Sequence, residues 1–210
     1  MMPAKKAAAA GGAVLAVALA AGLALYGTGM IGGNTAPCAG VAAMTDRLAP
    51  LARGEVAALE ILKAPRPAPV LTFKGPDGQD TGLSGMKGRT LLVNLWATWC
   101  APCKAEMPAL DRLQASFDPK EFQVVAINVD TRNLDRPPLW LKENAIHALA
   151  YYADPAGRVL PALQKETGST GLPTTLLVDS DGCTLGVMKG PAEWSSEDAR
   201  RLVGAALGRT

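Results

Sequence analysis

From residue 70 onward, apolar and polar positions alternate in blocks that have the lengths of strands and helices. Residues 90–96 and 122–129 are almost wholly apolar runs of strand length, which is typical of strands buried on both faces. Apolar residues at helical spacing predict helices at 106–117, 136–146, 156–166 and 195–207. Further strands are expected at 70–73, 174–179 and 183–188.

The order of these elements indicates the fold class. Strand, helix, strand and helix are followed by two strands around the turn Ser180-Asp181-Gly182, a hairpin signal, and by a last helix that Ser195 is placed to cap. This order predicts an α/β or α+β layer fold around one central sheet. The 210 residues suffice for one well-buried domain with an extension.

The N-terminal region has the pattern of a membrane segment. No charged side chain occurs between residues 7 and 45, and residues 7–31 are the most apolar part. About 20 apolar residues cross a bilayer as a helix, and Lys5 and Lys6 before the run favour a cytoplasmic N-terminus. The prediction is therefore a cytoplasmic end at 1–6 and a transmembrane anchor at 7–31, with the remainder in the periplasm.

Two alternatives for this region stay open. Ala-x-Ala triplets within the apolar run would suit a cleaved signal peptide, although the run is longer than a usual signal core. Lipid modification of Cys38 is disfavoured because Thr35-Ala36-Pro37 matches the lipoprotein cleavage pattern poorly. All three possibilities export the rest of the chain.

A linker and short helices are expected between the anchor and the main domain. Residues 32–37 are small, and 38–62 carries apolar residues near helical spacing, interrupted at Pro50 and Gly54. Prolines 65, 67 and 69 then predict a stiff extended connector. We therefore expect an extension at 32–69 and the main domain at 70–210.

Composition excludes two classes of protein. Apolar residues make up 49% of the chain and charged residues 19%, which excludes a disordered chain. The net charge is +2, and the basic residues are scattered, so nucleic acid is not an expected partner. A monomer is expected.

The candidate chemistry lies in Trp99-Cys100-Ala101-Pro102-Cys103, between a buried strand and a predicted helix. A cysteine in a first helical turn faces free N–H groups and the positive end of the helix dipole, which favours thiolate. The two-residue spacer allows the sulfurs to join. Cys100 is therefore the expected nucleophile and Cys103 the more buried resolving thiol, with Pro102 fixing the geometry between them.

Two other interpretations of this pair are weaker. A zinc site needs two further ligands, but the chain has one histidine, His147, and no second pair of cysteines at this spacing. A purely structural disulfide between cysteines this close is also disfavoured. We expect neither a metal nor a cofactor.

The segment 91–108, Leu-Leu-Val-Asn-Leu-Trp-Ala-Thr-Trp-Cys-Ala-Pro-Cys-Lys-Ala-Glu-Met-Pro, resembles the membrane-anchored TlpA branch of the thioredoxin superfamily. The likeness continues through 124–130, 171–179 and 190–194. It implies a thioredoxin-like fold, with a central mixed sheet and helices on both faces. It also implies a thiol–disulfide oxidoreductase.

The resemblance implies roles for single positions. Pro173 matches the cis-proline that faces the reactive disulfide, although an ordinary turn proline is the plain alternative. Glu106 matches an active-site glutamate that assists proton transfer near Cys103, the alternative being a solvated residue of the first helical turn. Trp99, Ala101, Pro102 and Leu172 would contact the substrate. Many thioredoxins have an aspartate where this chain has Asn94. An asparagine side chain cannot take up a proton, so the general base would be Glu106, water or another group.

Cys38 and Cys183 remain after the reactive pair is assigned. An intrachain bridge, two free thiols and an intermolecular bond are all compatible with the residues, and the resemblance favours the intrachain bridge. An oxidising compartment would suit it.

The resemblance also implies the biological task. Relatives of this branch reduce cysteine pairs in proteins that assemble the copper site of cytochrome oxidase, and a transmembrane thiol-transfer protein supplies the electrons. Two alternatives stay open: reduction of apocytochrome c cysteines, and a Cu(I) metallochaperone that uses both cysteines as soft ligands.

Overall fold

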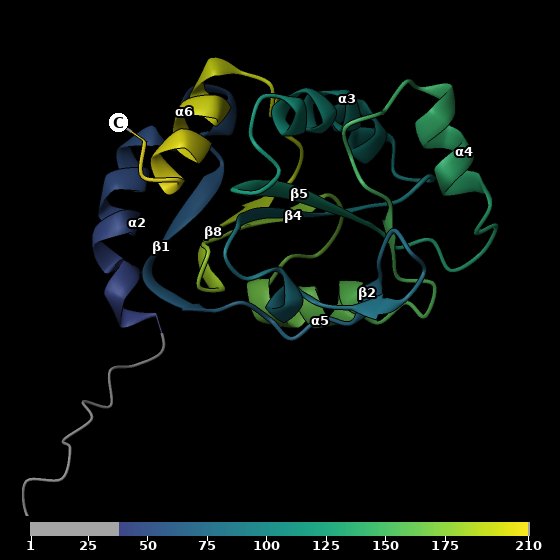
Figure 1. Ribbon diagram of the computed structural model, residues 1–210, viewed down its shortest axis with the longest axis horizontal. Helices are drawn as coiled ribbons and strands as arrows, with labels where there is room; N and C mark the ends of the chain where they lie inside the picture. Colours follow the sequence, from purple (N-terminus) through teal and green to yellow (C-terminus); the bar gives the residue numbers. More distant parts are fainter. Residues whose placement is uncertain (1–37, 210) are drawn as a thin grey trace, which may run out of the picture. The chain divides into compact units, whose positions relative to one another are not determined.

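The computed structural model describes residues 38–209, which form an eight-stranded mixed sheet in the order β1-β8-β7-β4-β5-β6-β2-β3 (Figure 1). Strands β4 (Thr90–Trp96) and β5 (Phe122–Asn128) are parallel neighbours at its centre. On the other side of β4, β7 (Thr174–Val178) and β8 (Cys183–Lys189) continue the sheet antiparallel. The expected central mixed sheet is confirmed.

Helices cover both faces of the sheet, as expected. Figure 1 shows α3 (Ala101–Ala115) and α6 (Glu197–Ala206) on one side and α5 (Val159–Thr167) on the other. A fourth helix, α4 (Arg136–Glu143), follows β5. All seven residues of β4 are buried, because this strand lies between the two helical layers. This position explains why it reads as one continuous apolar run.

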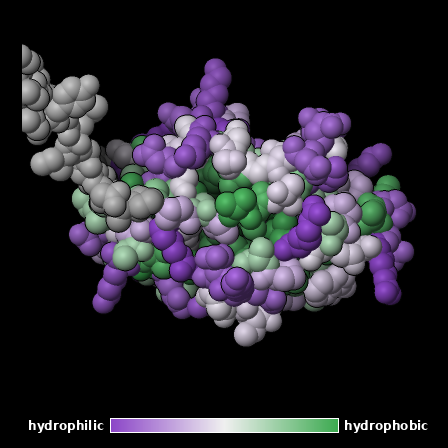
Figure 2. Space-filling model, turned by 90° about the horizontal axis from the view of Figure 1, so that it is seen from below, coloured by the Kyte–Doolittle hydropathy of each residue, from purple (hydrophilic) through white to green (hydrophobic). Residues whose placement is uncertain are grey.

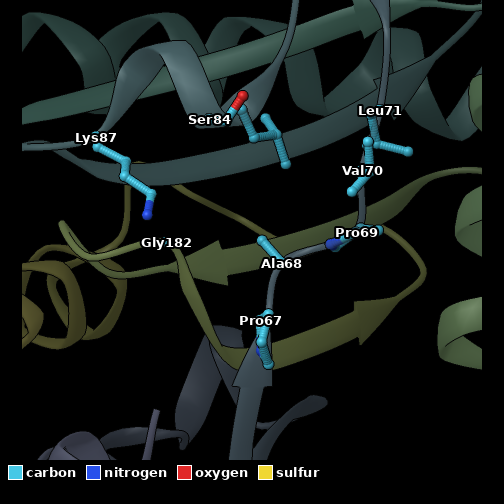
Figure 3. Close-up of a pocket in the computed structure, with 9 residues that line it drawn as sticks. Pro67, Ala68, Pro69, Val70, Leu71, Ser84, Lys87 and Gly182 are labelled. Atoms are coloured by element: carbon cyan, nitrogen blue, oxygen red, sulfur yellow. The ribbon is translucent and has the colours of Figure 1, made fainter. Parts of the chain in front are cut away.

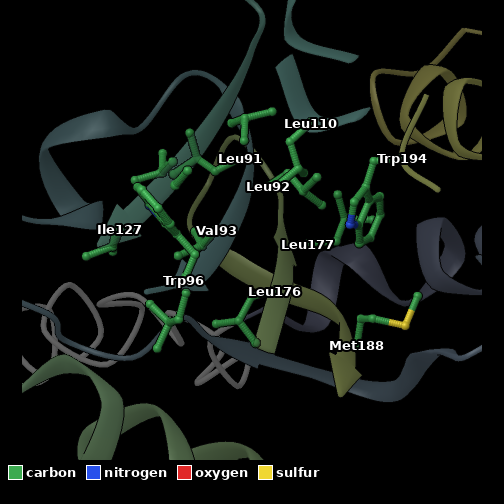
Figure 4. Packing of buried hydrophobic residues seen from close by; sticks show 14 of the residues in the cluster. Leu91, Leu92, Val93, Trp96, Leu110, Ile127, Leu176, Leu177, Met188 and Trp194 are labelled. Carbon is green, nitrogen blue, oxygen red and sulfur yellow. The ribbon is translucent and has the colours of Figure 1, made fainter. Parts of the chain in front are cut away.

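The hydrophobic core surrounds the central strands. Trp96, at the end of β4, and Trp194, just before α6, are both completely buried (Figure 4). Trp96 also contacts the ring of Trp140, with a centroid distance of 5.6 Å. The end of β4 that precedes the cysteines is thus held in a packed environment.

The far edge of the sheet consists of very short strands. The strand expected at 70–73 is only Phe73–Lys74 (β2), and it pairs with Asp80–Thr81 (β3) and with β6 (Tyr152–Ala153). A 3-10 helix, Leu83–Met86 (η4), leads into β4. Two-residue strands carry no periodicity, so the pattern did not reveal β3 and β6.

The segment before residue 70 corrects the prediction. The helical part is shorter than expected: η1 (Ala39–Val41), α2 (Ala42–Leu48), η2 (Ala49–Leu51) and η3 (Gly54–Val56). It is followed by the nine-residue strand β1 (Leu59–Pro67). This strand pairs antiparallel with β8, with an irregular register between Ile61 and Arg66.

The expected proline connector and the boundary at residue 69 were therefore wrong. The prolines at 65 and 67 belong to β1, which lies at the edge of the sheet, and edge strands accept proline because one side needs no ladder hydrogen bond. The described residues 38–209 all belong to one compact unit. The extension is thus part of the domain.

Two helix starts also differ from the expected ones. Helix α3 begins at Ala101 instead of residue 106, because Cys100 itself occupies the N-cap position. Helix α6 is capped by Ser196 and not by Ser195: the Ser196 hydroxyl oxygen accepts the Ala199 N–H at 3.1 Å. The other central elements end within about three residues of the expected positions.

A disulfide joins Cys38 to Cys183, with the two Cα atoms 5.7 Å apart. It connects the beginning of the described chain to the first residue of β8. The cytoplasmic end at 1–6, the anchor at 7–31 and the linker at 32–37 lie outside the described residues. Within residues 38–209, no helix combines the length and apolar character that a membrane crossing requires.

Candidate active site

Cys100 and Cys103 lie where β4 passes into α3, and they form a disulfide with a Cα–Cα distance of 5.3 Å. The Cys103 N–H points at Cys100 Sγ, at 3.3 Å. This N–H is one of the donors that a helix start leaves without an intrahelical partner. Together with the helix dipole it favours a thiolate at Cys100 once the disulfide is reduced.

The two cysteines differ in burial. Cys100 retains 6% of its surface, whereas Cys103 is completely buried. Ala101 and Pro102 between them are exposed, and Trp99 is 67% exposed. The exposed residues that a partner protein can contact therefore surround Cys100, the cysteine of the pair that keeps some surface, whereas Cys103 has none.

Pro173 lies beside the same end of the sheet. Thr174 begins β7 and pairs with Leu95 of β4, so the preceding residue is next to the segment that leads to Cys100. The Leu172–Pro173 peptide bond is cis, and Pro173 is buried while Leu172 is half-buried. A cleft of about 220 Å³ runs along residues 168–173 and is closed by Lys189 and Gly190. The fold thus brings the expected substrate-contact residues to one end of β4 and β7.

Glu106 is buried, with only 4% of its surface exposed, and is not a solvated residue of the first turn. Its Oε1 accepts the Asn94 amide at 2.8 Å. Its Oε2 accepts the Ala192 N–H and the Trp194 indole N–H, both at 3.2 Å. Burial raises the pKa of Glu106 to about 7, and these three hydrogen bonds only partly offset that rise. A carboxyl group with this pKa can accept or release a proton near neutrality.

Asn94 has a role that the sequence did not suggest. Its amide donates to Glu106 and to Thr175 Oγ1, the latter at 2.9 Å, while its own Oδ1 is buried without a partner. It therefore links β4 and β7 to the glutamate on α3. From the sequence, Asn94 stands out only as the residue that replaces the aspartate of many thioredoxins.

Sequence reasoning also missed the contribution of Trp194 and Ala192. Both come from the segment before α6 and reach Glu106 across about 86 residues of sequence. In the sequence, residues 190–194 stand out only as part of the family resemblance. Pairing of such distant segments is set by the sheet topology and leaves no local signal.

Clefts also lie away from the cysteines. One, of about 210 Å³, lies between residues 67–71 and a group formed by Leu83, Ser84, Lys87 and Gly182 (Figure 3). Another, of about 580 Å³, is bordered by Arg47, Arg201 and Arg209. Figure 2 shows that apolar surface gathers in the middle of the face seen from below Figure 1, with hydrophilic surface around it. Among the described residues, no three His, Cys, Asp or Glu side chains are grouped as metal ligands.

Comparison with known proteins decides the family. The model of the Redoxin family matches residues 63–203 of this chain, which is more than half of it. The chain belongs to the Redoxin family.

The relatives of this Redoxin protein include thiol-disulfide oxidoreductases. The thioredoxin-like protein YneN of Bacillus subtilis is 31% identical over 121 residues, which cover 55% of this chain and 65% of YneN. The thiol-disulfide oxidoreductase ResA of Bacillus thuringiensis subsp. konkukian is 27% identical, over 62% of this chain and 72% of ResA.

A solved structure shows the same fold. A thiol:disulfide interchange protein of the thioredoxin family from Chlorobium tepidum is 31% identical, with a TM-score of 0.55, and the match covers 69% of this chain and 97% of that one. The Redoxin protein therefore has a thioredoxin-like fold and belongs to the thioredoxin-like thiol–disulfide oxidoreductases.

Proposed function

We propose that this protein exchanges dithiols and disulfides with protein substrates, with Cys100 as the attacking thiolate and Cys103 as the resolving thiol. The observation that carries the proposal is the disulfide at the start of α3, in which Cys100 keeps 6% of its surface beside exposed residues and Cys103 keeps none. The family membership and the relatives support the same chemistry.

The reaction balances as two displacements. The reduced Cys100 thiolate attacks one sulfur of a substrate disulfide, and the second substrate sulfur leaves as a thiolate. Cys103 then loses its proton and attacks Cys100 Sγ, which releases the first substrate sulfur. The protein ends with a Cys100–Cys103 disulfide and the substrate with two thiols, so two electrons pass to the substrate.

Glu106 is the proposed acceptor of the Cys103 proton. It lies one helical turn beyond Cys103, on the same side of α3. Its pKa of about 7 leaves a substantial fraction ionised at neutral pH and able to take the proton. Leu172 would present its backbone to an extended substrate segment, and Trp99, Ala101 and Pro102 would contact the substrate around Cys100.

The Cys103→Ser variant tests the mechanism. Without a resolving thiol, the mixed disulfide between Cys100 and its partner should accumulate in cells, because no group displaces the substrate sulfur. Non-reducing gels and mass spectrometry would identify the adduct, and Cys100→Ser is the matched control that forms none. If the Cys103→Ser variant accumulates no adduct at Cys100, the exchange mechanism fails.

We further propose that the protein is a periplasmic reductase of the TlpA type, anchored by residues 7–31, which lie outside the described part. Its substrates would be cysteine pairs in proteins that assemble the copper site of cytochrome oxidase, and a transmembrane thiol-transfer protein would recharge it. The support is the resemblance of segment 91–108.

A redox equilibrium of the full chain against glutathione tests the direction. Trp99, exposed beside the cysteines, should report the redox state by fluorescence. A potential near that of thioredoxin, about −270 mV, supports a reductase, whereas one near −120 mV makes the protein an oxidant. Incubating the reduced protein with an oxidised copper-site assembly protein and with oxidised apocytochrome c would separate the two substrate classes by rate.

A further inference from the structure

The turn that presents Cys100 is held by a side chain from the segment that follows the neighbouring strand β5. The last main-chain hydrogen bond between the β4 and β5 segments runs from the Val129 N–H to the Trp96 carbonyl, at 2.9 Å. The Thr98 N–H then donates to Asp130 Oδ2 at 2.9 Å, and the Thr98 hydroxyl donates to Asp130 Oδ1 at 3.0 Å. The carboxylate thus continues the connection between the two chains after the backbone ladder has ended.

These two bonds act within the turn that leads into α3. The Cys100 N–H donates to the Ala97 carbonyl at 3.1 Å, so Thr98 and Trp99 are the central residues of the turn. Asp130 holds the first central residue by both its backbone and its side chain. The position of Thr98 in turn limits where Trp99 and Cys100 can lie.

Asp130 is itself firmly placed. It is buried, with 5% of its surface exposed, and its Oδ2 also accepts the Asn128 side-chain amide at 2.7 Å. Its own N–H donates to Asn128 Oδ1 at 3.1 Å. The Asp130 carboxylate thus accepts three hydrogen bonds. Movement that broke one of them would leave a buried polar group without a partner, so the carboxylate keeps a fixed position.

We propose that Asp130 is a positioning residue for the exchange reaction, acting through Thr98 to keep Cys100 Sγ against the Cys103 N–H. This inference rests on the proposed function of Cys100. The contact that it protects is the 3.3 Å hydrogen bond to the sulfur, which favours the thiolate. Asp130 lies outside the cysteine motif 99–103, at the last position of the similar segment 124–130, and the resemblance gives it no role.

Positioning and simple charge have opposite expected effects. A negative charge near a thiol disfavours its thiolate, so removing Asp130 would make Cys100 more reactive if charge alone mattered. If Asp130 acts by holding the turn, its removal lets the sulfur leave the N–H group, and Cys100 becomes less reactive. The sign of the change therefore separates the two effects.

A double-mutant cycle on the full-length protein tests the proposal. Alkylation of Cys100 by iodoacetamide would be followed at neutral pH after selective reduction, with mass spectrometry confirming the modified residue. We expect Asp130→Ala to slow the reaction roughly tenfold, as a one-unit rise in the pKa of a thiol would. Thr98→Val, which keeps the charge, should slow it about threefold, and the double variant should be no slower than Asp130→Ala.

Thr45→Val is the matched control. Thr45 is a buried threonine whose hydroxyl donates to the Ala42 carbonyl at 2.8 Å within α2, so this change also removes one hydroxyl hydrogen bond. It should leave the alkylation rate unchanged. If Asp130→Ala does not fold, as judged by near-ultraviolet circular dichroism, the comparison of Thr98→Val with Thr45→Val decides alone.

The proposal is overturned if Thr98→Val reacts like Thr45→Val, if Asp130→Ala reacts faster than the wild type, or if the two effects multiply in the double variant. Failure of the proposed function looks different: the wild-type Cys100 would then react no faster than a free cysteine. If the wild-type Cys100 is reactive and the variants are alkylated at the same rate, only the role of Asp130 is excluded.

Discussion

At the residue scale, the site depends on one buried acid and its partners. The cysteine pair could be predicted from the sequence because its short motif carries its own chemistry, whereas Glu106 was suggested only by the family resemblance. The hydrogen bonds from Asn94, Ala192 and Trp194 could not be predicted, because β7, β8 and the segment before α6 must first fold against α3. These contacts are what make Glu106 a buried group.

The raised pKa of Glu106 predicts a pH-dependent stability. Between about pH 4.5 and 7, the native protein holds a proton that the unfolded chain has lost, so the free energy of unfolding decreases as the pH rises through this window. The shift corresponds to roughly 3 kcal/mol, and outside the window Glu106 contributes no slope. Glu106→Gln should remove this decrease in urea unfolding of the oxidised protein.

The same variant should slow the resolving step. Glutamine cannot take the Cys103 proton, and loss of a general base costs about a hundredfold or more. Decay of a preformed mixed disulfide at pH 7 measures this step. Glu166→Gln, at an exposed position on α5, is the control for both measurements and should behave as the wild type. An unchanged decay rate in Glu106→Gln would remove the glutamate from the mechanism.

At the scale of the elements, burial determined which predictions succeeded. Strands β4 and β5 are enclosed by helices, so their apolar runs identified them to within one residue. Strand β1 lies at the edge of the sheet, contains two prolines and has a register irregularity, so its pattern resembled a short helix followed by a connector. Edge strands need neither an unbroken apolar run nor a complete set of donors.

The start of α6 gives a prediction at this scale. Ser196→Ala removes the oxygen that accepts the Ala199 N–H, and loss of such a cap costs about 1 kcal/mol of stability. Ser195→Ala is the neighbouring control, since Ser195 contacts Arg112 and Glu193 near the surface and does not cap the helix. Urea denaturation should show the larger loss for Ser196→Ala, and the reverse order would mean that the cap is assigned to the wrong serine.

At the scale of the whole molecule, two disulfides have different tasks. Cys100–Cys103 closes a separation of three residues and lies at the accessible helix start, whereas Cys38–Cys183 closes 145 residues and joins the first described residue to β8. The residues alone left three possibilities for Cys38 and Cys183, since sequence spacing does not indicate which distant cysteines meet in space.

Removing the long-range bridge should destabilise the domain without altering its chemistry. In the chain-entropy model a loop of this length contributes up to about 5 kcal/mol, so Cys38→Ser combined with Cys183→Ser should shift urea unfolding to clearly lower concentrations. The alkylation rate of reduced Cys100 should stay within about twofold of the wild-type rate. A loss below about 1 kcal/mol would show that α2 and β1 hold this end of the chain without the bridge.

The position of Cys38 also bears on how the domain withstands force. If the chain is held at its N-terminus, tension enters the described part at this residue and passes through a covalent bond directly to Cys183 and β8. Helix α2 and the hydrogen bonds of β1 then carry little of the load, although they come first along the chain. With the bridge intact, a pull on Cys38 should leave α2 and β1 in place until β8 itself separates from the sheet. After reduction, α2 and β1 should detach first.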